Sequence, residues 1–365
     1  MRNVFCLVIV LSGCGETMVE PPPAPSVAVL GAGNHTIAGV EIVVLADESG
    51  VLDTPRDLGL DPSEPNTLYL VNRNTSVVRI DDLGGAAQRS ELLAGPGSNH
   101  FLAHPSAIAF GAPGTFATAP EEDQETQPGD PLDFMGPSLW TTDRAIFNAG
   151  TASHLDMLHN SPNAAGIAWE GGNAYWVFDG MHAALTRYDF AEDHGPAGVD
   201  HSDGIVTRHV EGQVAYRPRV PSHMEWVDGL LYVADTGNNR VAVLDPTTAA
   251  FAHPIGPNYD SSIQSAMTGS TLTTLIAGAT IERMTAPSGL AIDGDILFVG
   301  DNESARIWGF DRVTGGLIDW LDLDAMIAPG GLMGIEVDAN GRLLVVDARG
   351  NRLLRIAPLM PPLEP

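Results

Sequence analysis

The chain has 365 residues, a formal net charge of −28 and an isoelectric point near 4.4, and its 18 basic residues are all arginine because it contains no lysine. This composition excludes Schiff-base chemistry on lysine, and it makes nucleic acid an unfavourable partner because the protein repels another polyanion. It favours cations, cationic substrates or simple solubility. The 40 glycines and 27 prolines, with few helical patterns, indicate a turn-rich, all-β protein.

The first residues have the pattern of a secretion signal. A basic start is followed by the apolar run Val4–Leu11, which is too short to span a bilayer. The letters LSGC then resemble the lipobox of bacterial lipoproteins, which implies that residues 1–13 are removed and that Cys14 is lipidated through its sulfur. Cys6 would leave with the signal, so no intrachain disulfide could form. An ordinary signal peptide with an unrelated cysteine is the alternative.

Residues 14–34 contain the letters PPPAP, show neither strand nor helix periodicity, and are predicted to form a semi-rigid tether. Residues 35–365 are then predicted to be one folded domain. The lipobox resemblance implies a membrane anchor at Cys14, outside the cytoplasmic membrane. Gly15 stands where an aspartate often signals retention at the inner membrane, which favours the outer membrane or the cell surface.

Beyond the tether, six stretches of the chain repeat one pattern. The clearest copies are Pro221–Asp245 and Pro287–Asp311, in which an aspartate follows the first proline by 14 positions and an arginine follows that aspartate by five. Each copy predicts three antiparallel strands, with the aspartate accepting backbone N–H groups and the arginine pairing nearby. The positions interpreted as structural are Asp235, Arg240, Asp301, Arg306, Asp347 and Arg352.

Looser copies fill the rest of the domain. They are Pro55–Arg79, Pro105–Asp143 and Pro162–Arg187, and the second is predicted to end its middle strand at Asp143 after a long insertion. The repeats resemble the NHL family of β-propellers, whose motif runs Pro-x-Gly, apolar strand, Asp-Gly, apolar strand, Asp-x-x-Asn-x-Arg. This resemblance implies a six-bladed β-propeller and leaves the activity open.

The last repeat, Gly334–Ile356, supplies only three strands. The apolar run Val40–Leu45 precedes the first repeat and has no local partner. Placing this N-terminal strand as the outer strand of the last blade closes the ring and removes two open sheet edges.

The position of a residue within its predicted blade also indicates on which face of the propeller its side chain lies. In a propeller the strands of a blade run from a, at the axis, to d, at the rim. The loops between blades and the b-to-c turns share one face. His104, His159 and His223 stand near the predicted starts of three inner strands, and His182 and Asp57 belong to the same face. Imidazoles with a carboxylate suit Zn²⁺ or a similar metal at the channel mouth. The alternative is a set of separate, hydrogen-bonded residues.

A zinc enzyme of the same family, the peptidylglycine α-amidating lyase, carries its zinc histidines directly after the strand-a proline. The positions that match this motif hold Arg56, Ser106, Asn163, Ser222 and Ser288. Because none of them is histidine, the resemblance does not extend to the lyase activity.

A second candidate metal site uses the loop between strands c and d of the third blade. Asp193, Asp200 and Asp203 lie in this loop with His194 and His201, and oxygen-rich loops suit Ca²⁺. The alternative is a solvated loop whose carboxylates bond their own backbone. The insertions at 111–137 and 246–270 are expected on this same face.

The sequence thus predicts a monomeric propeller that binds or scaffolds a protein or a small molecule through one face, without nucleic acid. The competing hypothesis is a metal-dependent lyase or hydrolase centred on the three histidines. P-loop, GxGxxG, CxxC and GxSxG motifs are absent from the sequence. The catalytic residues, the substrate and the choice between zinc, calcium and no cofactor stay open.

Overall fold

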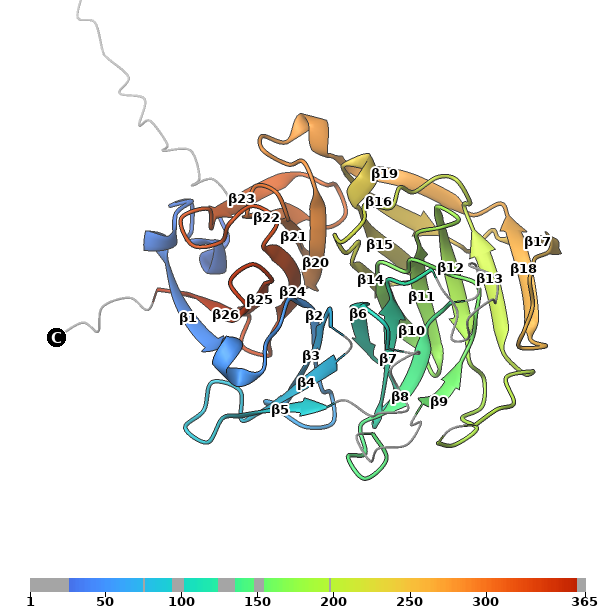
Figure 1. The fold of residues 1–365 in the computed structure, drawn as a ribbon. Helices are drawn as coiled ribbons and strands as arrows, with labels where there is room; N and C mark the ends of the chain where they lie inside the picture. The colour runs from blue at the N-terminus through green and yellow to red at the C-terminus, as the bar shows by residue number, and fades with distance from the viewer. Residues whose placement is uncertain are drawn as a thin grey trace, which may run out of the picture.

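The computed structural model is an all-β, six-bladed propeller whose sheets surround one axis (Figure 1). It describes residues 26–74, 76–93, 102–123, 135–147, 154–196 and 198–359. Among these residues, helical structure is limited to short 3-10 turns, and no helix has the length and apolar character needed to cross a membrane. The turns are η1 (Ala28–Leu30), η2 (Ile37–Gly39), η3 (Glu48–Gly50), η4 (Thr236–Asn238) and η5 (Gly278–Thr280).

Each blade is an antiparallel sheet with its first strand at the axis. Blade 1 contains β2 (Pro55–Leu60), β3 (Leu68–Asn72), β4 (Ser76–Asp81) and β5 (Arg89–Leu93). Blade 2 contains β6 (Pro105–Phe110), β7 (Thr115–Pro120), β8 (Ser138–Thr141) and β9 (His154–Met157). Blade 3 begins with β10 (Ile167–Gly171), β11 (Ala174–Asp179), β12 (Ala184–Asp189) and β13 (Ile205–His209).

The second half of the ring repeats this plan. Blade 4 contains β14 (Met224–Val227), β15 (Leu230–Asp235), β16 (Arg240–Asp245) and β19 (Thr271–Ala277). Blade 5 contains β20 (Pro287–Asp293), β21 (Ile296–Asp301), β22 (Arg306–Asp311) and β23 (Leu317–Asp322). Blade 6 contains β24 (Leu332–Val337), β25 (Leu343–Asp347), β26 (Arg352–Pro358) and β1 (Val40–Ala46).

The predicted closing strand is confirmed. β1 pairs antiparallel with β26, from Val40 opposite Pro358 to Ala46 opposite Leu353. The first strand of the folded domain therefore completes the last blade, and this pairing closes the ring of blades.

The predicted Asp or Asn at the end of strand b is found in five blades, and the predicted Asp–Arg pair in blades 4 and 6. Asp235 forms an ion pair with Arg240 at 2.7 Å. Asp347 forms one with Arg352 at 2.5 Å. Both carboxylates are buried, and each ion pair therefore satisfies polar groups that are shielded from water at the turn. The last residues of strand b in these five blades are Asn72, Asp179, Asp235, Asp301 and Asp347.

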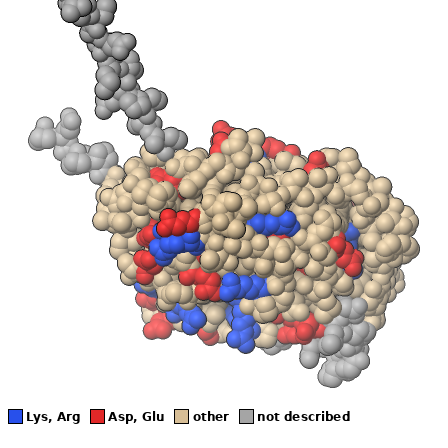
Figure 2. All heavy atoms as spheres, turned by 90° about the horizontal axis from the view of Figure 1, so that it is seen from above, with Lys and Arg blue, Asp and Glu red and all other residues tan. Residues whose placement is uncertain are grey.

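Blade 5 uses its arginine differently. Arg306 pairs with Asp322 at 2.6 Å, at the rim end of the sheet, while Asp301 accepts only backbone N–H groups. Arg283 also pairs with Asp322, so one carboxylate holds two guanidinium groups. A view of one side of the disc shows acidic and basic side chains next to one another in this way (Figure 2).

Neighbouring blades pack through aromatic and branched side chains. Trp176 of β11 is 1% exposed and stacks on Trp226 of β14, with ring centroids 5.8 Å apart. Truncating such a buried aromatic side chain typically costs about 3–5 kcal/mol. The tryptophans therefore fill the space between sheets that no single blade could bury alone.

The assignment of strands in blade 2 from the sequence was wrong. Strand b is β7, which ends at Pro120, and Asp143 instead follows strand c, β8. The sequence SLWTTD has the apolar-then-aspartate pattern of a strand b, whereas the true strand, TFATAP, ends without an aspartate. The insertion 121–137 therefore joins strands b and c, on the face opposite to the expected one.

The expected tether is too long. Val27 and Leu30 are buried in the core next to blades 5 and 6, and the Val27 N–H donates to Asp319 Oδ2 at 2.9 Å. The Gly33 N–H donates to the same oxygen at 3.1 Å. The folded domain thus begins near Val27, ahead of residue 35, because the short apolar segment covers strands of blade 5.

The insertion 246–270 forms the hairpin β17 (Ala250–Pro254) and β18 (Ile263–Thr268). It leaves blade 4 but joins blade 3, where β18 pairs parallel with β13. Blade 3 consequently has six strands. Sequence periodicity alone gives no indication of this exchange between blades.

We expect Asp301→Ala to lower the free energy of unfolding by about 3–5 kcal/mol, because four buried or part-buried backbone N–H groups lose their acceptor. Chemical denaturation measures the loss. Asp311→Ala is the matched control, because Asp311 makes similar bonds to Val313 and Thr314 in an exposed turn. Equal losses in the two variants would contradict the structural role of the buried aspartate.

Candidate functional site

Two hollows lie along the propeller axis, one at each end. The first is a cavity of about 240 Å³ lined by the six inner strands β2, β6, β10, β14, β20 and β24. It contains four titratable side chains from three blades and is called the axial channel below. These side chains are Asp57, His223, Glu225 and Glu336.

His223 and Asp57 are the two predicted site residues that the structure brings together. The His223 Nε2 atom lies 3.5 Å from Asp57 Oδ1, which is long for a hydrogen bond. Burial raises the pKa of Asp57 well above its ordinary value, and burial lowers the pKa of His223 to about 3. Burial therefore favours the neutral form of both groups, which suits a structural contact.

The pKa values of the two channel glutamates are also raised by burial. Glu225 extends from β14 and Glu336 from β24, and both line the axial channel. Burial raises the pKa of Glu336 to about 7, and burial together with the charge of Glu336 raises the pKa of Glu225. The channel is thus rich in carboxyl groups whose neutral form is favoured by burial.

These raised pKa values predict a pH dependence. Through Glu336, the folded protein binds more protons than the unfolded chain between pH 4.5 and about 7, so this group makes the free energy of unfolding fall as the pH rises through that window. Glu336→Gln should remove part of this fall and be about 1–2 kcal/mol more stable than the parent at pH 8, with little difference at pH 4. Urea denaturation at both pH values measures this. Glu41→Gln, an exposed change on β1, is the control. An unchanged pH slope in Glu336→Gln would contradict the prediction.

The second hollow lies on the face formed by the loops between blades and the b-to-c turns. Its volume is about 590 Å³. It is lined by arginines from four separate segments, although the whole chain has only 18 arginines and a net charge of −28. We call this hollow the arginine pocket and define it by Arg56, Arg73, Arg217, Arg219 and Arg349.

Arg56 forms the floor of the arginine pocket. Its side chain is fully buried, and its Nη1 atom lies 2.8 Å from Glu121 Oε2. This ion pair engages Nη1, whereas Nε and Nη2 of Arg56 are buried without a hydrogen-bond partner within the described part of the chain. Buried guanidinium donors without an acceptor are costly, and an added anion would satisfy them.

Glu121 belongs to the insertion of blade 2 and orients the pocket wall. Burial opposes its ionisation, but the charge of Arg56 and hydrogen bonds from Tyr216 and Arg219 hold the pKa of Glu121 below its ordinary value. The Tyr216 hydroxyl donates to Glu121 Oε1 at 2.6 Å. The Arg219 backbone N–H also donates to this oxygen. Glu121 is therefore an anion that fixes the loop carrying Arg217 and Arg219.

The other arginines leave the arginine pocket with a surplus of positive charge. Arg217 pairs with Glu303, the only carboxylate in the described lining. Arg73, Arg219 and Arg349 form no ion pair with a carboxylate of the described residues. The Arg73 Nε atom is also buried without a hydrogen-bond partner there. The hollow therefore combines a buried guanidinium floor with further guanidinium groups that no carboxylate of the described residues neutralises.

The remaining predicted metal ligands each pair with a carboxylate of their own. His104 contacts Glu122 at 3.0 Å, and His182 contacts Asp179 at 2.9 Å within one turn. His159 contacts Asp260 at 2.5 Å. The structure therefore does not gather His104, His159, His182 and His223 around one point; the shared face was predicted, but strand and loop paths separate the side chains.

The His159–Asp260 pair fastens the hairpin β17–β18 to the ring. The His159 N–H donates to Asp260 Oδ2 at 2.9 Å, in addition to the contact of the ring nitrogen Nδ1. Both side chains are buried.

We expect Asp260→Ala to lower the free energy of unfolding by about 2–4 kcal/mol, because His159 keeps its burial and loses its partner. Thermal and urea unfolding measure the change. Asp228→Ala serves as the control, since Asp228 is 71% exposed and its pair with Arg312 should contribute about 1 kcal/mol or less. A loss in Asp260→Ala no larger than in the control would contradict this role.

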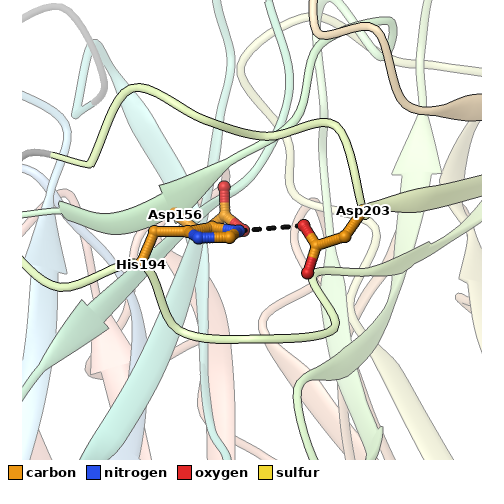
Figure 3. Close-up of side chains that lie close together, drawn as sticks. All are labelled: Asp156, His194 and Asp203. Carbon is orange, nitrogen blue, oxygen red and sulfur yellow. Dashed lines mark hydrogen bonds and ion pairs between the residues drawn. The ribbon is translucent and has the colours of Figure 1, made fainter.

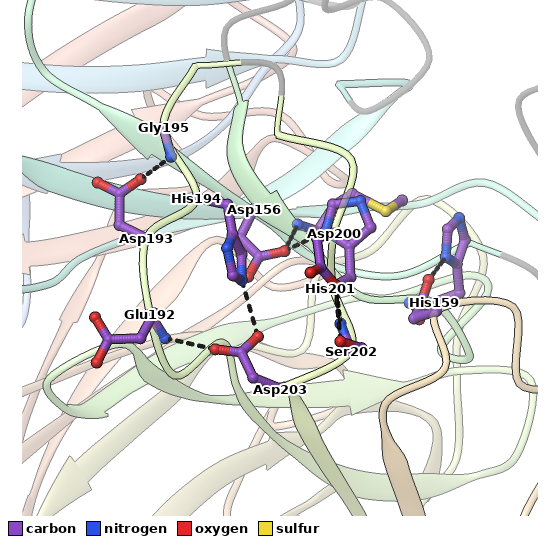
Figure 4. Close-up of polar contacts among 12 residues, drawn as sticks. Asp156, His159, Glu192, Asp193, His194, Gly195, Asp200, His201, Ser202 and Asp203 are labelled. Atoms are coloured by element: carbon purple, nitrogen blue, oxygen red, sulfur yellow. Dashed lines mark hydrogen bonds and ion pairs between the residues drawn. The ribbon is translucent and has the colours of Figure 1, made fainter.

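The three residues predicted for Ca²⁺ separate into two groups (Figure 4). Asp193 and Asp200 accept bonds from Gly195 and Ser202, two residues further along their own loop. Asp203 instead turns towards His194 and Asp156 of the neighbouring blade (Figure 3). The solvated-loop alternative thus describes two of the three aspartates.

Comparison with known proteins adds only the fold. No protein-family model and no curated protein matches the chain. A solved luciferin-regenerating enzyme has 16% identity and a TM-score of 0.54, over 88% of this chain and 96% of its own. A gluconolactonase from Xanthomonas campestris has 13% identity and a TM-score of 0.54, over 92% and 94%. An auxiliary nutrient binding protein from Bacteroides thetaiotaomicron has 13% identity and a TM-score of 0.55, over 83% and 68%. These identities are low, so the likeness shows a shared propeller architecture and no shared activity.

Proposed function

We propose that the protein is a binding module that holds a small anionic ligand, carrying carboxylate or phosphate groups, in the arginine pocket. The observation that carries this proposal is the fully buried Arg56, whose Nε and Nη2 donors have no hydrogen-bond acceptor among the described residues although the residue lines a hollow. A carboxylate or phosphate oxygen supplies the acceptors that the guanidinium geometry requires.

The charge distribution supports an anion over a cation or a neutral ligand. A chain with a net charge of −28 gains solubility from acidic groups spread over its surface, and a cluster of arginines opposes that trend. Arginine forks also bind planar anions through two parallel hydrogen bonds, which fixes orientation as well as charge. The general acidity of the chain would exclude large polyanions by long-range repulsion while the pocket attracts a small one.

The size of the hollow supports a small molecule. A volume of about 590 Å³ falls in the usual range of small-ligand pockets. Its walls are turns between strands, such as the b-to-c turns that hold Arg73 and Arg349, and propellers carry binding groups on such loops because the sheets beneath are rigid.

We expect full-length protein to bind citrate or pyrophosphate, used as probe anions, in isothermal titration calorimetry at low ionic strength. Arg349→Gln and Arg73→Gln should weaken binding by about tenfold or more each, the value of one charge-assisted hydrogen bond. Added salt should weaken binding further, because the open side of the pocket is screened. A preference for one probe distinguishes carboxylate from phosphate recognition.

Arg89→Gln is the matched control for this titration. The Arg89 side chain is 70% exposed, pairs with Asp81 on blade 1 and does not line the pocket. The proposal fails if neither anion binds the parent protein, or if Arg349→Gln and Arg73→Gln bind as tightly as Arg89→Gln.

We further propose that the module is a bacterial lipoprotein of the NHL type, anchored through Cys14 outside the cytoplasmic membrane. Cys14 and the signal residues 1–13 lie outside the described residues, and the lipobox letters and the repeat motif support the proposal. Incorporation of labelled palmitate that is lost in Cys14→Ser is the direct check. Unlabelled parent protein would refute the anchor without affecting the binding proposal.

A further inference from the structure

A cluster of metal-ligand side chains lies at the rim of the propeller and shares no residue with the arginine pocket. Asp156 belongs to β9, the outer strand of blade 2, whereas His194 and Asp203 belong to the loop between β12 and β13 of blade 3. One ligand atom from each residue lies within 4.8 Å of the other two. Figure 3 shows the three side chains pointing toward one another across the boundary between the blades.

One carboxylate oxygen of the buried member, Asp156, lacks a partner, whereas the other is engaged by His201 and the Met157 N–H. Asp156 is 0% exposed, and its Oδ1 atom lies 2.5 Å from the His201 Nδ1 atom. Its Oδ2 atom is buried and has no hydrogen-bond partner among the described residues. A buried carboxylate oxygen without a donor is costly, and a cation held by the same side chains would relieve that cost.

The other two members are already oriented. His194 Nε2 lies 2.9 Å from Asp203 Oδ1. The Glu192 N–H donates to Asp203 Oδ2 at 3.1 Å, which fixes the rotation of that carboxylate (Figure 4). His201 in turn orients Asp156. Ligands held by outer hydrogen bonds of this kind are typical of metal centres.

We propose that Asp156, His194 and Asp203 bind one divalent transition-metal ion of the zinc class and thereby fasten the loop of blade 3 to the outer strand of blade 2. One imidazole and two carboxylates match the nitrogen and oxygen ligands that zinc takes, with water completing the four positions. The proton shared between His194 and Asp203 leaves when the metal binds. Calcium is disfavoured, because it requires six to eight oxygen ligands and this cluster offers an imidazole in place of one of them.

The site differs from both metal sites that the sequence suggested. It shares Asp203 and the neighbouring His194 with the loop of the calcium hypothesis, but it adds the strand residue Asp156 of another blade and leaves out Asp193 and Asp200. It lies at the rim and contains none of the channel histidines. Its role is structural, since it joins two neighbouring blades.

The test uses untagged full-length protein treated with EDTA and then titrated with Zn²⁺ alone by calorimetry. The parent should bind one ion per chain, and Zn²⁺ should raise the midpoint of thermal unfolding because only the folded state holds the complete site. Asp203→Asn and His194→Ala should each weaken zinc binding at least tenfold and abolish the rise in midpoint. Both are partly exposed, so they should unfold near the parent midpoint in EDTA.

Asp200→Asn is the matched control, because Asp200 lies in the same loop and bonds only to Ser202. It should bind zinc as the parent does. The proposal is overturned if the parent binds no zinc, if Ca²⁺ binds and Zn²⁺ does not, or if Asp203→Asn and Asp200→Asn have equal zinc affinity while both retain the parent midpoint in EDTA.

Discussion

The antiparallel ladder between β1 and β26 joins the two ends of the folded domain within one sheet. An unclosed ring would expose the edge of blade 6 and leave the inner strands of blades 1 and 6 without a common axis. With the ladder formed, every blade has a neighbour on each side, and apolar faces that a lone four-stranded sheet would leave in water become core. The N-terminal segment around Val27 extends this closure by covering blade 5.

Closure also creates the two hollows on the axis. The arginine pocket draws Arg56 from the first blade and Arg349 from the last, which are neighbours only in a complete ring. The axial channel similarly draws Asp57 and Glu336 together. The two ends differ in charge because burial raises the pKa of the channel carboxyls and so favours their neutral form, whereas guanidinium groups stay charged when buried.

Much of the architecture was predictable because it repeats locally. Asp301 accepts the N–H groups of Glu303 and Ser304, and Asp235 pairs with Arg240, all within a few residues, so both aspartates could be recognised by spacing. Blade 2 shows the limit of this reasoning, since Asp143 has the right local pattern on the wrong strand. The arginine pocket was overlooked, although Arg73 and Arg349 lie in b-to-c turns and sorting the arginines by face would have placed both at one end.

The sequence by itself therefore determined the period of the strands, the turns between them and the strand that closes the ring, because each depends on neighbours along the chain or on an unpaired apolar run. The tertiary structure alone decided that His159 meets Asp260, that β18 joins β13, and that Asp156 meets His194 and Asp203. Those contacts join residues from different blades, and their distances depend on the path of each loop across the ring. Alternating strand patterns carry no information about that path.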